Sequence, residues 1–197
     1  MADYSNHIEA VTIAPMTPRD VESFHQALDI VARERKYLSF LEAPPLDQTR
    51  TFIVDRIGRG DPGFVAVVRG EVVGWCDISR HDRQIHAHRG TLGMGIVPDY
   101  RGRGLGLRLI NAALTEARNI GFVRIELSVH SDNARAISLY YKVGFVTEGV
   151  QRDAVAKTPA DEQSPVSPSR PKSGDGPSRP LHGRPTGASA IRRARPR

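Results

Sequence analysis

The organisation of this chain follows from twelve residues, Gly95-Ile96-Val97-Pro98-Asp99-Tyr100-Arg101-Gly102-Arg103-Gly104-Leu105-Gly106. The apolar residues before Pro98 predict the end of a strand, the glycines predict a tight turn, and a helix is expected to begin at Leu105. Glycines let a ligand approach the backbone closely, and the first N–H groups of a helix have no partner within it. The segment therefore predicts an anion site at a helix N-terminus.

Two common phosphate-binding patterns fit this turn poorly. A nucleoside-triphosphatase loop needs Lys-Ser or Lys-Thr after the glycines, and neither pair follows them. A dinucleotide fingerprint needs a third glycine at the position where Leu109 stands. The turn by itself leaves two interpretations open, an anion site of another kind and a flexible connection between strand and helix.

Hydrophobic periodicity on both sides of the turn predicts alternating strands and helices. Strands are expected near residues 11–13, 64–68, 72–76, 91–97, 125–129 and 145–150, and helices near 17–31, 47–57, 105–119 and 133–142. The order β-α-α-β-β-β-α-β-α-β predicts an α/β (α+β) fold with a mixed sheet flanked by helices.

Composition changes at residue 157. The 197 residues carry a formal net charge of +6, but residues 157–197 hold 8 of the 14 prolines and 9 Lys/Arg against 3 Asp/Glu. Such a segment buries too little apolar surface to offset the entropy lost on folding. We expect a folded domain at 1–156, formally neutral, and a disordered basic tail rich in Pro, Ser and Arg at 157–197. The charge that favours nucleic acid belongs to the tail alone.

Cysteine usage and hydropathy predict a soluble cytoplasmic protein without a membrane partner. Cys76 is the single cysteine, which excludes an intramolecular disulfide and a multi-cysteine metal site. The N-terminus has no secretory pattern, and no apolar run is long enough to span a bilayer. His81, His86 and His88 match no ligand spacing, so we expect a solvated loop and no metal.

Two sequence blocks resemble the GNAT superfamily of N-acetyltransferases. Arg101, Gly104 and Gly106 match its pyrophosphate motif, R/Q-x-x-G-x-G/A. Residues 133–145, Asn-Ala-Arg-Ala-Ile-Ser-Leu-Tyr-Tyr-Lys-Val-Gly-Phe, are similar to its N-x-x-A-x-x-L-Y-x-K-x-G-F segment. The resemblance covers about residues 11–155. It implies the acyl-CoA N-acyltransferase fold, with acetyl-CoA between two splayed parallel strands, here those ending at Val97 and Val129.

The implied activity is an acyltransferase that moves acetyl from acetyl-CoA to a primary amine, on a small molecule or a peptide N-terminus, in a ternary complex. Residues 34–37 are expected near the acceptor, and a homodimer is a further expectation. The resemblance assigns to the cofactor the strand end, the turn and two positions of the second block: Met94, Gly95, Ile96, Val97, Arg101, Gly102, Arg103, Gly104, Leu105, Gly106, Leu107, Asn133 and Lys142.

Tyr140 matches the general acid of the superfamily. A phenol with a pKa near 10 donating to a thiolate whose conjugate acid has a pKa near 8.5 is uphill by only about 2 kcal/mol. For the base, the ribosomal-protein alanine N-acetyltransferases that this sequence resembles have a carboxylate where Ser128 stands here. Glu126, on the same face of its strand, is the expected base through a water molecule, and Asp77 is a weaker candidate.

The resemblance fails at the C-terminus, because members of the superfamily end with a strand beside the one near 145–150. No alternating apolar run follows Val155, so this strand is expected to be missing. We hypothesise that a shifted reading frame or sequence error replaced the natural C-terminus, which resequencing would test. Two other functions stay open, a non-catalytic acyl-CoA-binding protein and a nucleic-acid-associated protein acting through its tail.

Overall fold

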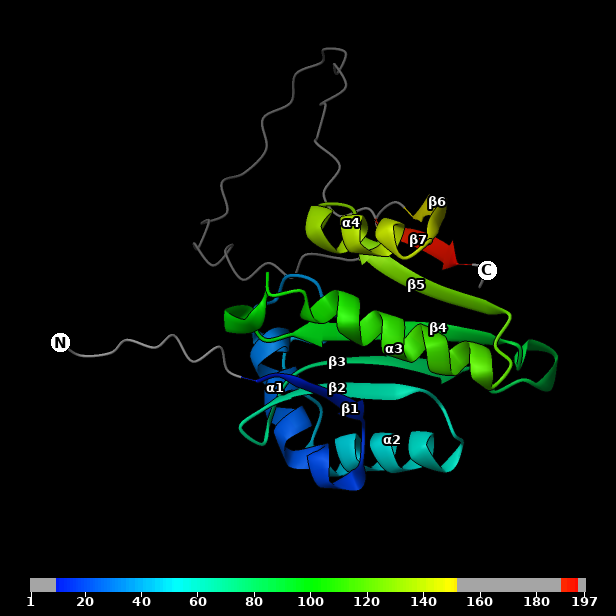
Figure 1. The fold of residues 1–197 in the computed structure, drawn as a ribbon. Helices are drawn as coiled ribbons and strands as arrows, with labels where there is room; N and C mark the ends of the chain where they lie inside the picture. Colours follow the sequence, from blue (N-terminus) through cyan, green and yellow to red (C-terminus); the bar gives the residue numbers. More distant parts are fainter. Residues whose placement is uncertain (1–9, 152–188, 195–197) are drawn as a thin grey trace, which may run out of the picture.

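The computed structural model describes residues 10–151 and 189–194, which form one mixed sheet with helices on both faces (Figure 1). The predicted order of elements is confirmed. The strands, in sheet order, are β1 (Thr12–Pro15), β2 (Gly63–Val68), β3 (Glu71–Arg80), β4 (Arg89–Ile96), β5 (Arg124–His130), β7 (Ser189–Ala194) and β6 (Val146–Gln151). The helices are α1 (Val21–Arg33), α2 (Leu46–Gly58), α3 (Leu105–Asn119) and α4 (Ala134–Lys142), with short 3₁₀ turns at Pro18–Asp20, Gln84–His86 and Pro98–Tyr100.

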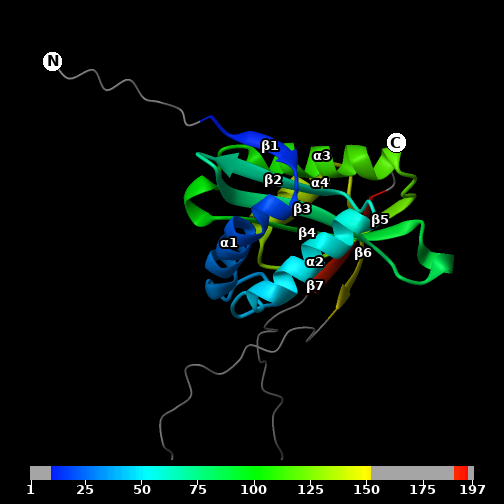
Figure 2. The same ribbon diagram turned by 90° about the horizontal axis from the view of Figure 1, so that it is seen from below.

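Each face of the sheet has its own hydrophobic core. The helices α1 and α2 cover one face and α3 and α4 the other (Figure 2). On the first face, the ring of Phe24 meets Trp75 edge to face at 5.3 Å between centroids. On the second face, Leu109 and Ile110 of α3 are fully buried against the sheet. Burying each such side chain contributes about 2 kcal/mol, which fixes the helices and the turn that begins α3.

The parallel strands β4 and β5 separate soon after they pair. Their register has three pairs, the last of which joins Thr91 to Glu126. Beyond it β4 runs on to Ile96, paired with β3 alone, while β5 runs on to His130 beside β7. The predicted splayed strand pair is therefore confirmed, and the opening faces the carboxyl ends of both strands.

The expectation that no strand follows Val155 is wrong. Strand β7 lies between β5 and β6 and pairs antiparallel with both, with Ala190 opposite Val129 on one side and Val150 on the other. A strand bonded along both edges gains two rows of backbone hydrogen bonds, so its own hydrophobic pattern contributes less to its placement. Six residues of the predicted disordered tail are thus part of the sheet.

Several expectations fall outside the described residues. The structure does not describe residues 1–9, 152–188 and 195–197. Most of the basic tail that was proposed to attract nucleic acid falls in these ranges. Within the ranges that the structure does describe, no helix has the length and apolar character needed to cross a bilayer.

Candidate functional site

The predicted anion site is built from residues with left-handed backbone. Gly102 has φ of +84°, and Gly104, which precedes the first residue of α3, has φ of +77°. An L side chain at such angles costs about 1–2 kcal/mol, so both positions favour glycine. In the described part of the chain, no hydrogen bond is donated by five consecutive N–H groups, those of residues 102–106. They are free to bind an anion at the positive end of α3.

The N–H of Leu107 differs from those five, because it already donates to the carbonyl of Gly104 at 3.1 Å. Gly106 has another function, close packing. A Cβ there would lie 3.0 Å from Cδ2 of Leu139 in α4 and 3.4 Å from Cδ1 of Ile96 in β4. The absence of a side chain lets the first turn of α3 sit directly against both elements.

Arg101 does not point its guanidinium freely into the turn. Its Nε donates to the carbonyl of Ile96 at 2.7 Å, and its two terminal nitrogens donate to the carboxylate of Glu34, at 2.9 Å for Nη1. The hydrogen bond from Arg101 is the main cause that lowers the pKa of Glu34. The structure therefore gives Arg101 a positioning role, which joins the end of β4 to the residue after α1.

Arg135 brings a cation to the free amides, and the sequence analysis missed it. A Cβ at Gly102 would lie 2.9 Å from its Nη2, so the guanidinium extends over the turn. Lys142 lies at the other end of α4 and is exposed. Arg103 packs its guanidinium over the ring of Tyr100, 5.1 Å from the centroid. Positions 135 and 142 are seven residues apart, so they share a face of α4 but lie about two turns from each other along it, and the sequence does not show which one meets the turn.

Only alternate residues of β4 direct their backbone N–H and C=O groups into the splayed opening. The N–H of Val97 donates to Val73 of β3 at 3.0 Å. Because hydrogen-bonded pairs alternate in an antiparallel ladder, Gly95 also turns its N–H and C=O toward β3. The amide groups of Met94 and Ile96 then face the opening. Of the four residues at the end of this strand that the resemblance assigns to the cofactor, residues 94–97, only these two direct their amide groups into the opening.

Asn133 serves as the N-cap of α4. Its Oδ1 accepts a hydrogen bond from the N–H of Ala136 at 3.1 Å, as capping residues commonly do. This contact accounts for an asparagine at this position and fixes the start of the helix that carries Arg135 and Tyr140.

Tyr140 is buried on the α3–α4 face beside the ring of Phe145, at 5.8 Å between centroids. Burial, and secondly the nearby thiol of Cys76, raises the pKa of Tyr140 above its ordinary value. The phenol is therefore protonated throughout the physiological range. Cys76 is opposite Met94 in the ladder, so Tyr140 approaches the sheet at the splayed part of β4.

Glu126 is poorly suited to accept a proton. Nη2 of Arg89 lies 2.8 Å from each of its oxygens, and Nε of Arg124 donates to Oε1. Burial alone would raise the pKa of Glu126, but the hydrogen bonds from Arg89 and Arg124 outweigh it and lower the pKa. A carboxylate held by two guanidinium groups has a reduced affinity for protons.

Asp77 has the opposite character. It is buried on the α1–α2 face, where Nη1 of Arg56 lies 3.1 Å from its Oδ2. Burial is the largest influence, and with a smaller contribution from the charge of Asp61 it outweighs Arg56 and raises the pKa of Asp77 to about 6. Asp77 therefore has a higher affinity for a proton than Glu126, the opposite of what their order as candidate bases in the sequence would suggest.

The segment between α1 and α2 reaches the end of β5. The ring of Tyr37 meets His130 edge to face, at 5.9 Å between centroids. Ser128 and Glu126 precede His130 at alternate positions of β5, and these three side chains share the face covered by α1 and α2.

The remaining residues that the sequence analysis singled out have structural surroundings that account for them. Trp75 and Cys76 are core residues, as expected. The rings of His81 and His86 are arranged edge to face, with 6.3 Å between their centroids. No group of three or more His, Cys, Asp or Glu residues capable of holding a metal ion was found in the part of the chain described.

Comparison with known proteins agrees with this geometry. Residues 27–145 match the model of the Acetyltransferase (GNAT) family. The chain is 32% identical over 142 residues to the L-amino acid N-acetyltransferase AaaT of Escherichia coli, covering 71% of this chain and 85% of that protein. It is 40% identical over 83 residues to the N-alpha-acetyltransferase RimI of Mycobacterium tuberculosis, covering 42% of this chain and 51% of that protein.

Solved structures show the same fold. An acetyltransferase of the GNAT family from Streptococcus pneumoniae superposes with a TM-score of 0.76 at 21% identity, over 94% of this chain and 99% of that one. The yncA protein of Salmonella typhimurium, a putative acetyltransferase solved with acetyl-CoA, gives 0.75 at 17% identity over 94% of each chain.

Proposed function

The chain belongs to the acetyltransferase (GNAT) family, and on that premise we propose that it transfers the acetyl group of acetyl-CoA to a primary amine in a ternary complex. Its acyltransferase character follows from the family. Acetyl-CoA as donor is supported by the structural relatives that were solved with it. An amine acceptor is supported by the sequence relatives, which are named as an L-amino acid N-acetyltransferase and an N-alpha-acetyltransferase.

One observation carries the proposal, the row of free amides at the start of α3. Five N–H groups and the guanidinium of Arg135 surround the turn of residues 102–106 at the open end of β4. A diphosphate carries negative charge and many acceptor oxygens, which such a row can bind. The outward amides of Met94 and Ile96 lead from there along the strand, so an extended arm with its own amide groups would reach the middle of the splayed opening.

The reaction needs a polarised carbonyl and a proton donor for the leaving thiolate. Outward backbone N–H groups of β4 are placed to stabilise negative charge on the thioester oxygen during attack. Tyr140 holds its proton at neutral pH and lies by the same part of β4. The burial that raises its pKa also raises the proton affinity of a thiolate formed beside it, so the transfer stays near balance.

Binding and turnover test the proposal separately. Titration calorimetry with acetyl-CoA and with desulfo-CoA should show binding, because the diphosphate is common to both. Thiol release should then depend on added amine, assayed with free amino acids, a polyamine and peptides with a free N-terminus. A folded protein that binds neither coenzyme would refute the proposal. Binding without amine-dependent thiol release would favour a non-catalytic acyl-CoA-binding protein.

A further inference from the structure

Asp77 lies on β3 beside the splayed part of β4, on the face of the sheet opposite Tyr140. It faces Gly93 in the β3–β4 ladder, two residues beyond the last β4–β5 pair at Thr91. A Cβ at Gly93 would lie 3.3 Å from Oδ1 of Asp77, so the missing side chain leaves room for the carboxylate over the backbone of β4. Cys76, its neighbour in sequence, points to the other face and toward Tyr140.

The opposed placement of Tyr140 and Asp77 matches the needs of acyl transfer. The proton donor for the leaving sulfur lies on the α3–α4 face of the strand pair, and a buried carboxylate lies on the α1–α2 face. An amine attacking the carbonyl from the α1–α2 side would present its N–H groups to that carboxylate. Glu126 also lies on this face, but both its oxygens are already held by Arg89 and Arg124.

Charged groups from several elements surround Asp77. From α2, Arg56 is buried and contacts its carboxylate, while donating also to the hydroxyl of Ser79 and to the carbonyl of Pro62 at 3.4 Å. From the segment after α2, Asp61 is buried and is paired with Arg80 at 3.7 Å. These charges keep the group ionisable inside the protein, with a pKa raised to about 6 chiefly by burial.

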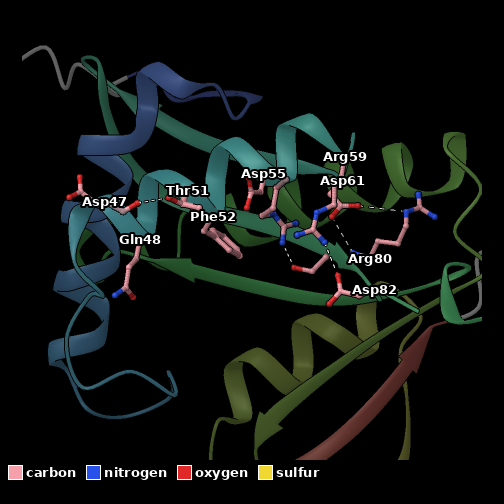
Figure 3. A pocket seen from close by; sticks show the side chains of 11 residues that line it. Asp47, Gln48, Thr51, Phe52, Asp55, Arg59, Asp61, Arg80 and Asp82 are labelled. Atoms are coloured by element: carbon pink, nitrogen blue, oxygen red, sulfur yellow. Dashed lines mark hydrogen bonds and ion pairs between the residues drawn. The ribbon is translucent and has the colours of Figure 1, made fainter. Parts of the chain in front are cut away.

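A cavity continues from this cluster to solvent. It has a volume of about 570 Å³ and lies between α2 and the end of β3 (Figure 3). Arg56, which contacts Asp77, and Ser79, which accepts a hydrogen bond from Arg56, are part of its lining, and Asp61 and Arg80 point into it. A space of this size is large enough to hold water. Asp77 itself does not line the cavity and is joined to it through its contact with Arg56.

From this geometry, and resting on the proposed function, we infer that Asp77 accepts the proton of the attacking amine and that Arg56 positions it beside the cavity. The amine nitrogen forms a bond to the carbonyl carbon, and the C–S bond breaks. One N–H proton passes to the carboxylate of Asp77, and the proton of Tyr140 passes to the departing thiolate. The products are an amide and a thiol, after which Asp77 releases its proton to water and Tyr140 is reprotonated.

The test compares Asp77→Asn with the matched variant Glu126→Gln in the full-length protein. The rate kcat is measured by thiol release at saturating amine from pH 5 to 9. Wild type should lose activity below an apparent pKa near 6. Asp77→Asn should lower kcat by roughly 100-fold or more and remove that limb, as expected for the loss of a general base. Glu126→Gln should keep the limb, whereas loss of the limb in this variant and not in Asp77→Asn would assign the base to Glu126.

Calorimetric titration with acetyl-CoA provides the control, since Asp77→Asn should bind it as wild type does. Asp77→Glu, which keeps the charge, should recover part of the activity and the acidic limb. A wild-type profile without a limb between pH 5 and 7.5 would overturn the inference even if the Asn variant did not fold. An active wild type whose Asn variant keeps its kcat and pH profile would overturn the role of Asp77 alone. A wild type without amine-dependent turnover would overturn the proposed function as well.

Discussion

Replacing Gly104 with alanine tests whether the left-handed backbone of the turn, without any change in packing, is needed to bind acetyl-CoA. Gly104 has φ of +77°, and a Cβ there would meet nothing within 4 Å. The only cost is the left-handed conformation, about 1–2 kcal/mol. Because no packing holds the residue at this angle, the free protein should relax to negative φ and reorient the amides. Binding must then restore the turn, which predicts a dissociation constant for acetyl-CoA raised by roughly 5- to 30-fold.

The matched control is Gly121→Ala at the other end of α3. Gly121 has φ of +87° and equally open surroundings, but it precedes the buried Phe122 and lies away from the turn. It should lower the free energy of unfolding by about 1 kcal/mol and leave the affinity unchanged. Urea denaturation and calorimetric titration measure both quantities for each variant. If Gly104→Ala bound acetyl-CoA like wild type, or Gly121→Ala bound it as weakly, the reading of the turn as the anion site would be refuted.

Three other predictions follow from contacts described above. Arg135→Gln should raise the dissociation constant for acetyl-CoA roughly tenfold at low salt and less at high salt, whereas Arg118→Gln at the end of α3 should not; equal effects would exclude a specific role for Arg135. Glu34→Gln should lower the unfolding free energy by about 1–2 kcal/mol near neutral pH. The difference from wild type should begin to shrink as pH falls below the ordinary pKa of a glutamate and should vanish only below the lowered pKa of Glu34, where the carboxyl is protonated in the folded state; urea melts across pH would show a constant difference if this were wrong. Deleting residues 189–197 should leave β5 and β6 with unpaired edges and increase aggregation, measured by light scattering; an unchanged melting temperature and solubility would contradict this role of β7.

Local signals predicted the elements that carry the site. Helix α3 has the predicted limits, residues 105–119, because Gly104 and Gly121 mark its two ends with backbone angles that other residues adopt only at a cost. The strand positions followed from hydrophobic periodicity alone. The splayed strand pair came from the family resemblance, and the register of β4 and β5 confirms it.

Contacts between distant residues could not be predicted. The carboxylate that binds Arg101 belongs to Glu34, 67 positions earlier, so the motif, which assigned Arg101 to the cofactor, could not show this ion pair. Glu126 and Asp77 are both acidic residues on predicted strands, and only the three-dimensional structure shows that Asp77 is buried beside one arginine while Glu126 is held by two. Strand β7 was missed because the edges of β5 and β6, and not an alternating pattern, define its place.

The position of β7 also constrains how the protein is made. Its partners in β5 and β6 are synthesised well before it, since Gln151 ends β6 and Ser189 begins β7. Between the synthesis of β6 and that of β7, the edges of β5 and β6 that β7 later covers have no partner strand. A chaperone that shields these edges until β7 has been synthesised would limit aggregation of the partly folded chain.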